Sequence, residues 1–343
     1  MALPLKLDSP QLVLFGAGAS RGGLSHRPLP PPVDGDFFSV ANQLTGHGTP
    51  ALAKRVLRSV WELYGQVQGV GLEEYYRDIE TRAAIGSIAK SVGKPKEWSK
   101  RKADLEELIR RVYVQTTTQE TVTGREAVVS TSHRTILDAL QPRATVLTFN
   151  YDLLIEEAFS SASMWNPGDG YGSVLPGITK DWARLWLSGR NGTNPPKSKV
   201  TLLKLHGSLG WTLYANGALK LKDRPYYVRK GKVETISVLP PGWNKRIDRN
   251  PYKQFWRRAR LRLQACKSLL VIGYSLPETD LLAKALFGEV VRLRAGARKY
   301  LSQLVLVDPA PAVRAKLIRL FNPALGPLCE VQQYDTIGEF ASE

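Results

Sequence analysis

The sequence predicts an α/β protein with a Rossmann-like, doubly wound, mostly parallel sheet and a large helical insertion. First, five short apolar runs each end directly in a polar or glycine-bearing turn, as buried parallel strands do. Second, apolar residues at helical spacing follow several of these runs, which is typical of alternating strands and helices. Third, a mainly helical stretch lies between the first two runs. We therefore expect one domain over residues 1–343, with a helical insertion at about 40–140.

Composition and charge limit the class of protein. The 343 residues are 43% hydrophobic and 23% charged, which allows a sizeable core. The net charge of +17 favours anionic partners such as nucleotides, nucleic acid or an acidic protein surface. Cys266 and Cys329 are too few for a disulfide framework or a four-cysteine zinc site, so we expect a reducing cytoplasm. No apolar run has the length of a membrane span, and the N-terminus lacks a signal-peptide layout.

The first apolar run, residues 11–15, feeds a candidate phosphate-binding loop, Gly16-Ala17-Gly18-Ala19-Ser20. Gly16 and Gly18 carry no Cβ, so the backbone can turn tightly and approach a ligand closely. A helix starting just after them would aim unpaired N–H groups at a pyrophosphate. The third glycine of a dehydrogenase fingerprint would fall at Arg21, so a hydride-transfer loop is not predicted. A tight turn without a ligand remains the alternative.

Two segments separate the first predicted strand from the second. Residues 21–36 are too proline-rich for helix or strand, which leaves a lid over the ligand or a surface connection. From about residue 51 to 140 the apolar spacing is mainly helical. Within it, Asp104 followed by Glu107 resembles a capping arrangement at a helix start.

Two further strands end in polar residues that suit a ligand site. The run at 144–149 ends in Asn150 and Asp152, at the edge where open α/β sheets bind ligands. Capping of the next helix would explain Asp152 alone. The run at 200–205 ends in His206, and although a lone histidine is usually structural, this one also follows a strand. Between them we expect a short helix at 181–187 and a segment at 164–171 that folds over the ligand. Hairpin strands are expected at 211–238.

The C-terminal part adds two strands and a basic helix. The run at 268–272 ends in Gly273, Tyr274 and Ser275, and the run at 303–307 ends in Asp308, whose carboxylate suits a ribose hydroxyl. Nine Lys or Arg residues lie between positions 244 and 267, and most of their charge is expected on the outer face of a helix. That face is either solvated or a surface for nucleic acid or a partner.

With these turns aligned, the chain resembles the sirtuin superfamily, and more closely the bacterial sirtuin-like NAD-consuming proteins of anti-phage defence. The resemblance is carried by four motifs in the family's order: Gly16 to Ser20, Thr148 to Asp152, Leu205 to Ser208, and Gly273 to Asp280. It implies that Gly16, Ala17, Gly18, Ala19 and Ser20 bind the pyrophosphate, together with the turn at Gly273, Tyr274 and Ser275. It makes Asn150, Asp152 and His206 the catalytic residues and places Asp308 near the adenosine ribose.

Departures from the deacylating sirtuins decide among the family's activities. Those enzymes carry a four-cysteine zinc module, which two distant cysteines cannot build, and a glutamine where this chain has Phe149. We therefore expect no metal and an NAD+ glycohydrolase that releases nicotinamide and ADP-ribose. The resemblance implies control by self-assembly or by a separate defence partner, an ATPase or an Argonaute-type protein. A non-catalytic NAD or ADP-ribose sensor, a nucleic-acid-binding subunit and a deacylase remain alternatives.

Overall fold

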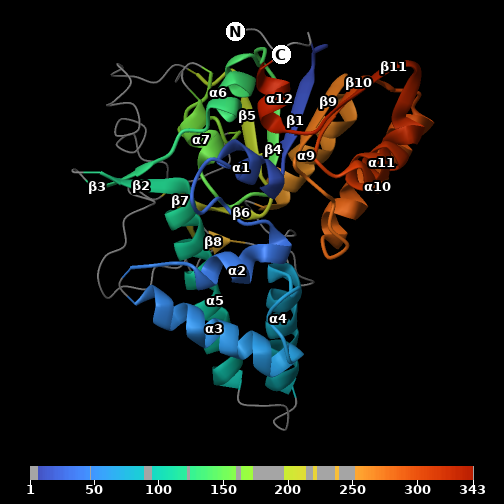
Figure 1. Cartoon of the computed structure of the whole chain (residues 1–343). Coiled ribbons are helices and arrows are strands. Elements are labelled where there is room, and N and C mark those ends of the chain that lie inside the picture. The colour runs from blue at the N-terminus through green and yellow to red at the C-terminus, as the bar shows by residue number, and fades with distance from the viewer. Residues whose placement is uncertain are drawn as a thin grey trace.

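A six-stranded, wholly parallel sheet organises the α/β part of the chain (Figure 1). The computed structural model describes residues 7–46, 48–88, 95–121, 124–159, 164–172, 197–213, 219–221, 236–238 and 252–342. The strands are β1 (Gln11–Phe15), β4 (Thr145–Thr148), β5 (Thr201–Lys204), β9 (Ser268–Ile272), β10 (Leu301–Val307) and β11 (Leu325–Tyr334). Their order across the sheet is β11-β10-β9-β1-β4-β5.

The strand order reverses next to β1. From β1 the chain moves outward to β4 and β5, then returns to the other side of β1 and moves outward again through β9, β10 and β11. Val13 accordingly pairs with Val146 of β4 and with Leu270 of β9. This confirms the predicted doubly wound sheet, and it places the crevice that such sheets offer to ligands at the carboxyl ends of β1 and β9.

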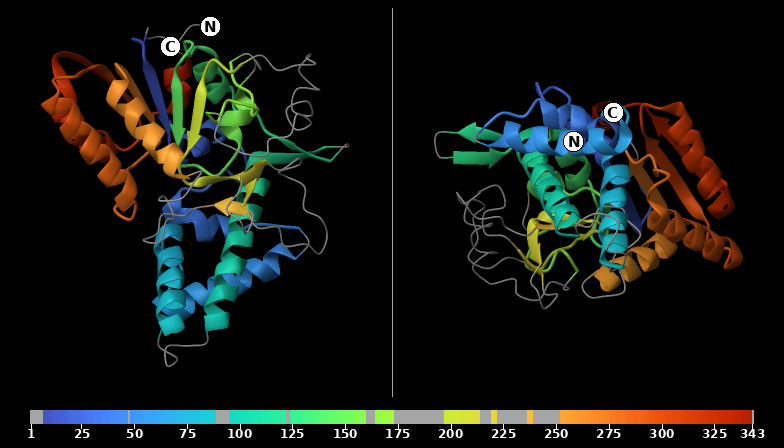
Figure 2. Two further views of the ribbon diagram at one scale, coloured as in Figure 1. Left: turned by 180° about the vertical axis from the view of Figure 1, so that it is seen from behind. Right: turned by 90° about the horizontal axis from the view of Figure 1, so that it is seen from below.

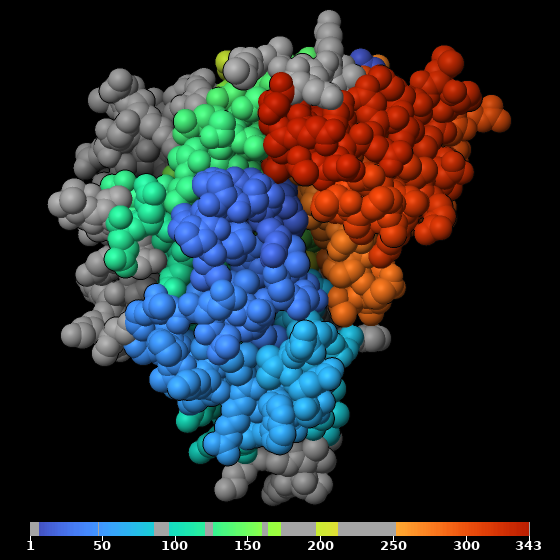
Figure 3. Space-filling view, in the orientation of Figure 1, coloured from blue at the N-terminus to red at the C-terminus, as the bar shows by residue number. Residues whose placement is uncertain are grey.

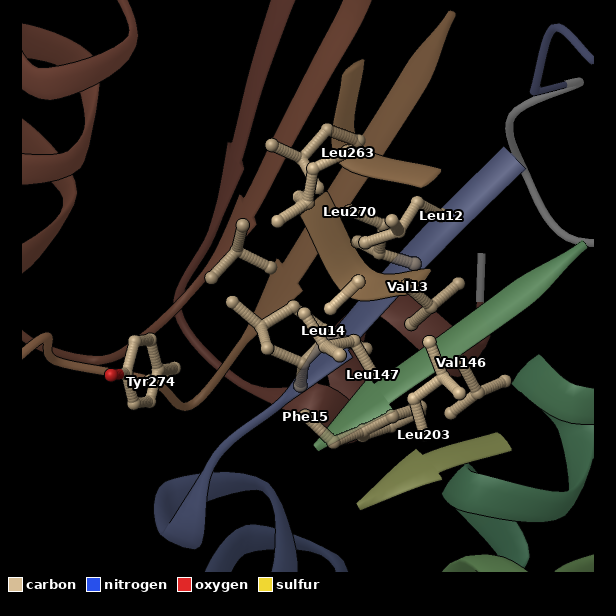
Figure 4. Close-up of a cluster of buried hydrophobic side chains, with 14 of the residues drawn as sticks. Leu12, Val13, Leu14, Phe15, Val146, Leu147, Leu203, Leu263, Leu270 and Tyr274 are labelled. Carbon is tan, nitrogen blue, oxygen red and sulfur yellow. The ribbon is translucent and has the colours of Figure 1, made fainter. Parts of the chain in front are cut away.

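Helices cover both faces of this sheet, which explains why β1 and β9 are mostly apolar and, like β4, buried along their whole length, whereas the edge strand β11 is partly polar and partly exposed. In the view of Figure 1, α1 (Ala17–Gly23), α6 (Thr131–Asp138) and α12 (Ile337–Ser342) lie in front of the strands. Helix α9 (Tyr252–Ala265) covers the opposite face, seen from behind in Figure 2. All five residues of β1 are buried, and Figure 4 shows Leu12 to Phe15 among side chains of the neighbouring strands.

The C-terminal helices complete the α/β part. Helix α10 (Leu281–Gly296) packs against α9 and against α11 (Pro311–Phe321), beside β10 and β11. The short α7 (Leu154–Ala158) follows β4. On α9 the predicted buried face is confirmed, since Trp256, Ala259 and Leu263 are all buried. Residues 244–251 of the basic segment lie outside the described part of the chain.

Helices α2 (Phe37–Asn42), α3 (Thr49–Tyr64), α4 (Leu72–Ile88) and α5 (Pro95–Thr117) form what we call the helical module. It projects from the carboxyl edge of the sheet (Figures 1 and 2) and has its own hydrophobic cluster. Tyr151 and Leu209 of the α/β part join that cluster and so connect the two cores. A hairpin of β2 (Thr118–Thr121) and β3 (Gly124–Ala127) then leads to α6, whose Ile136 and Leu137 pack with the sheet.

Two local expectations are wrong. Asp104 does not start a helix, because α5 already begins at Pro95, a residue favoured in the first helical turn. Asp104 instead forms an ion pair with Arg55 of α3, at 3.0 Å. The segment at 164–171 does not fold over a ligand either. Its Trp165 is buried in the sheet's hydrophobic cluster and stacks on Phe159 with ring centroids 5.5 Å apart.

A small antiparallel sheet lies beside the main one, with order β7-β6-β8. Its strands are β6 (Gly207–Leu213), β7 (Leu219–Leu221) and β8 (Ile236–Val238), which confirms the predicted hairpin strands. The turn at 214–218 and the helix expected at 181–187 lie outside the described residues. Within the described ranges, the helices are all too short or too polar to cross a bilayer.

Candidate functional site

The glycine loop joins the two halves of the sheet by backbone contact. The N–H of Gly16 donates to the carbonyl of Ile272 and the N–H of Gly18 to the carbonyl of Gly273, each at 2.9 Å. A Cβ on Gly16 would lie 2.4 Å from the Gly273 oxygen, and one on Gly273 would lie 2.1 Å from the Ala19 nitrogen. Gly273 also has a φ of 58°, which other residues rarely adopt. Both glycines are therefore required by close packing of backbone on backbone.

These same contacts occupy amide groups that the sequence assigned to a pyrophosphate. Besides Gly16 and Gly18, the Ala19 N–H is engaged, because it donates to the Gly16 carbonyl at 3.0 Å. The expectation that unpaired loop amides face the ligand is therefore wrong for these three groups.

Asn150, Ser20 and Asp152 form one buried hydrogen-bond chain at the ends of β1 and β4. The Asn150 Nδ2 donates to the Gly16 carbonyl at 2.8 Å and to Ser20 Oγ at 2.9 Å. Ser20 Oγ in turn donates to Asp152 Oδ2 at 2.7 Å, and Asp152 Oδ1 accepts the N–H of Leu154 at 3.0 Å. Asp152 is not the N-cap of α7, which is Leu153, but it holds the turn just before this helix and fixes Ser20 as well.

These hydrogen bonds determine which atom of Asn150 can contact a ligand. A backbone carbonyl only accepts hydrogen bonds, so the group beside Gly16 must be the amide nitrogen. Its two hydrogens are taken by Gly16 and Ser20. Asn150 lines the cavity described below, and it presents Oδ1 as an acceptor for a hydroxyl or a water.

Lys204 of β5 supports the turn that follows β4, at Asp152, from the interior of the protein. Its ammonium, fully buried, donates to the backbone carbonyl of Asp152 and forms an ion pair with Glu156 at 3.0 Å. The Tyr171 hydroxyl donates to Glu156 at 2.8 Å. Burial, followed by the negative charge of Glu156, raises the pKa of Tyr171 well above its usual value, so the phenol stays a donor. The charge of Lys204 is thus paired in the interior.

His206 faces Asp280, an acidic residue at the end of the fourth motif to which sequence reasoning gave no role of its own. The Nε2 of His206 lies 3.4 Å from Asp280 Oδ2, and both residues are buried. The Tyr274 hydroxyl donates to the same oxygen at 3.1 Å, while Asp280 Oδ1 accepts the Ala283 N–H at the start of α10. Burial raises the pKa of Tyr274 well above its usual value. Phe149 stacks on Tyr274 and meets the His206 ring edge-on, at centroid distances of 4.6 and 4.8 Å.

A cavity of about 570 Å³ brings most of these residues together. In Figure 3 the N-terminal residues, in blue, and the C-terminal residues from about 252 on, in orange and red, meet along a seam above the helical module. Of the predicted site residues, nine line the cavity: Ala17, Gly18, Ala19, Asn150, His206, Gly273, Tyr274, Ser275 and Asp308. Gly16, Ser20 and Asp152 are not among the lining residues, and their contacts hold the loop and Asn150 in place.

The helical module and the segment before it form another wall of this cavity, which the sequence did not predict in detail. Leu72 and Glu73 at the start of α4, Tyr113 of α5 and Asp34 line it. Glu73 accepts a hydrogen bond from Thr279 Oγ1, and the Glu73 N–H donates to Asp34 Oδ1 at 2.8 Å. An acidic residue in a first helical turn is common for helix stability alone, so its sequence carried no signal of a site.

Asp308 lines the far end of the cavity, next to Asp335 and Ile337. Its Oδ1 accepts the Ala310 N–H at 2.9 Å, and burial raises its pKa above the usual value. Among the described residues, groups of three or more His, Cys, Asp or Glu side chains placed to hold a metal ion are absent. The expectation that this protein works without a metal stays a prediction.

Residues 144–318 match the family profile described as a SIR2-like domain, and this range is just over half of the chain. The chain belongs to the SIR2-like family. The matched range of this SIR2-like protein contains Asn150, His206, Gly273 and Asp280, whereas the glycine loop lies before it. No curated protein matches the chain.

SIR2-like domains bind NAD+, so membership indicates an NAD-related function. The cavity suits such a ligand in two respects. Its volume is in the usual range for small-molecule and cofactor sites. Where Gly18 meets Gly273 on its lining, there is no room for side chains, which keeps the backbone close to whatever binds there.

Proposed function

We propose that this SIR2-like protein hydrolyses the bond between nicotinamide and ribose in NAD+, giving nicotinamide and ADP-ribose. The observation that supports the proposal most strongly is the convergence of three groups on one cavity at the carboxyl ends of β1 and β9. These groups are the glycine loop, the Asn150 amide oxygen and the paired His206 and Asp280.

The reaction needs few catalytic groups. The nicotinamide ring of NAD+ is positively charged, so it leaves as a neutral molecule and requires no general acid, unlike an ordinary sugar ether. In the hydrolysis the C1′–N1 bond breaks and its electron pair goes to the nicotinamide nitrogen. A water oxygen forms the new bond to C1′, and one water proton is released. The protein must hold the ribose, aim the water and accept the proton.

Asn150 and His206 suit the last two tasks. Asn150 Oδ1 can accept a hydrogen bond from the water or a ribose hydroxyl, and its orientation is set before any ligand arrives. His206 is the residue type that accepts a proton near neutral pH. Asp280 lies against its Nε2, so it can orient the ring and stabilise the imidazolium that forms.

The carboxylates of the cavity suit the positive charge of the reacting sugar. Asp280 is within 3.4 Å of His206, and Glu73 approaches the same region from α4 through its contact with Thr279. A ribose losing nicotinamide becomes oxocarbenium-like, and negative charge fixed nearby favours that state over the ground state.

Release of such an activity inside a cell would destroy its NAD+ pool, so we also propose a role as the NAD-depleting effector of an anti-phage system. Control would then come from self-assembly or from a separate partner, an ATPase or an Argonaute-type protein acting with or without nucleic acid. The proposed compartment is the cytoplasm, where NAD+ and phage nucleic acid are both present.

The test is to follow nicotinamide release from NAD+ by the purified protein, alone and with the product of its neighbouring gene. We expect release by the wild type under at least one of these conditions, and its loss in both Asn150→Ala and His206→Ala. Full activity in both variants would overturn the site. NAD+ binding without turnover under any condition would instead indicate a sensor, and turnover only with an acyl-lysine peptide would indicate a deacylase.

A further inference from the structure

The cavity has an unusual charge balance for a site that binds a dinucleotide. Five carboxylate residues line it: Asp34, Glu73, Asp280, Asp308 and Asp335. Among the described residues, Arg21 is the single lysine or arginine that does so. The diphosphate of NAD+ or ADP-ribose carries two negative charges, and a wall of carboxylates repels them. This repulsion must be offset by hydrogen-bond donors and positive charge elsewhere on the cavity wall.

The glycine loop supplies less of this compensation than its sequence indicates. The N–H groups of Gly16, Gly18 and Ala19 all donate to backbone carbonyls within the protein. They are therefore not free to bind a phosphate oxygen without breaking the turn of the loop or its contacts with Ile272 and Gly273. These three amides therefore do not offset the repulsion, and a side-chain donor next to the loop is the next candidate.

Arg21 has the right position for this role, and its guanidinium has unused hydrogen-bond donors. It follows the loop on α1, lines the cavity, and its side chain is 41% exposed. One terminal nitrogen, NH1, pairs with Asp36 Oδ2, and Asp36 is itself held because its Oδ1 accepts the Val33 N–H at 2.9 Å. A guanidinium has five donors in a rigid fork, so this anchor leaves donors for a phosphate.

We propose that Arg21 is the diphosphate-binding residue of this cavity, anchored by Asp36 so that its free edge faces the ligand. The choice of an adenosine diphosphate ligand rests on the proposed function, whereas the charge argument rests on the cavity alone. In a dehydrogenase loop the corresponding position holds the third glycine. In this chain it holds Arg21, whose positive charge would bind the diphosphate in place of the engaged loop amides.

The experiment compares three adenosine ligands, of which one carries a diphosphate and a second ribose, one carries a single phosphate and one carries no phosphate. ADP-ribose, AMP and adenosine are titrated against the full-length wild type, Arg21→Ala and Arg21→Lys, with binding measured by calorimetry at low and at moderate salt. Arg58→Ala is the matched control, because it removes an arginine from a surface ion pair on α3 that does not line the cavity. Thermal unfolding of each variant checks that the fold is intact.

We expect Arg21→Ala to weaken ADP-ribose binding by about 10- to 100-fold, the loss of charge-assisted hydrogen bonds. Arg21→Lys keeps the charge without the fork, so it should lose only about 3-fold. Adenosine binding should change little, and the salt dependence of ADP-ribose binding should be smaller in Arg21→Ala than in the wild type.

Equal loss for adenosine and ADP-ribose, or no loss for ADP-ribose, would overturn the role of Arg21. So would a wild type that binds adenosine as tightly as ADP-ribose. None of these results depends on turnover, so nicotinamide release by the wild type can still support the proposed function when Arg21 fails its test. Conversely, a phosphate-dependent loss in Arg21→Ala without nicotinamide release would leave a diphosphate site and remove the hydrolase.

Discussion

The cavity has two unlike walls. On the sheet side, Asn150 and Lys204 are buried and bonded to groups that are buried themselves. On the opposite side, Glu73 of the module and Arg21 of α1 are partly exposed, and Arg21 is held by a partly exposed ion pair with Asp36. Buried, satisfied networks are rigid and costly to break, whereas exposed pairs contribute little. The sheet wall is therefore suited to fix reaction geometry, and the module wall to adjust which ligand binds.

The largest expected effect comes from breaking the buried charge pair beneath the sheet wall. Lys204→Met leaves Glu156 without its counter-charge in the interior, and should lower the free energy of unfolding by about 3–5 kcal/mol. Urea unfolding followed by circular dichroism measures this loss.

A double variant tests whether charge is the cause. Lys204→Met combined with Glu156→Gln removes both charges, so it should recover part of the lost stability. If the double variant is less stable than the single one, the cost lies in packing, and the sheet wall owes its rigidity to something other than the ion pair.

The second effect is a pH dependence of stability. His133 is fully buried beside β1, stacks on Phe15, and burial lowers its pKa to about 4. The unfolded chain binds a proton at this residue below about pH 6.5, while the folded chain does not until about pH 4. Folding stability should therefore fall as pH drops through this window, by about 3 kcal/mol in total.

His133→Gln should remove this part of the acid sensitivity. The exposed His26 provides the matched control, since His26→Gln removes a histidine without changing the core. Unfolding curves of the three proteins at several pH values between 7 and 4 give the comparison. An equal loss of stability in wild type and His133→Gln would show that other groups cause the acid sensitivity.

The third effect concerns the orientation of His206. Asp280→Asn keeps an acceptor for the N–H of Ala283 and removes the charge beside the imidazole. We expect nicotinamide release to fall by about 10²-fold. The rising limb of the pH–rate profile should also move to lower pH, because the protonated ring loses a stabilising charge. If the rate falls but the pH–rate profile does not shift, Asp280 acts only as the cap of α10.

The smallest effect is expected on the module wall. Glu73→Gln should lower kcat/KM for NAD+ by about 5-fold through the lost negative charge near the ribose. Stability should hardly change. Glu74→Gln is the matched control, because Glu74 lies in the same first turn of α4 but does not line the cavity. If both variants lose activity equally, the helix start matters and the charge at the cavity does not.

The sequence predicted the sheet wall well because local signals specify it. Five of the six strands lie at the predicted apolar runs, and their polar turns follow them, so Asn150, His206 and Gly273 were found from position alone. The edge strand β11 was not predicted, because its sequence is partly polar. Parallel strands bring those turns to one edge, and the observed strand order confirms it.

The module wall could not be predicted in this way. Tyr113 and Glu73 reach the cavity only because α4 and α5 pack against the ends of the strands, a contact between segments far apart in sequence. The same holds for the engaged amides of Gly16 and Gly18, since their occupation depends on how closely the end of β9 approaches the loop. Apolar spacing predicts which face of a helix is buried, but not what that face meets.

The contact between Gly16 and Gly273 also affects when the site can exist. Gly16 emerges early from the ribosome, but its backbone partner belongs to a strand synthesised much later, and His206 meets Asp280 later still. Strands β1, β4 and β5 can pair beforehand, because they are neighbours that come first along the chain. A nascent chain therefore carries half a sheet and no cavity. If the protein is the NAD+ hydrolase proposed above, this order of synthesis withholds the site until translation is nearly complete.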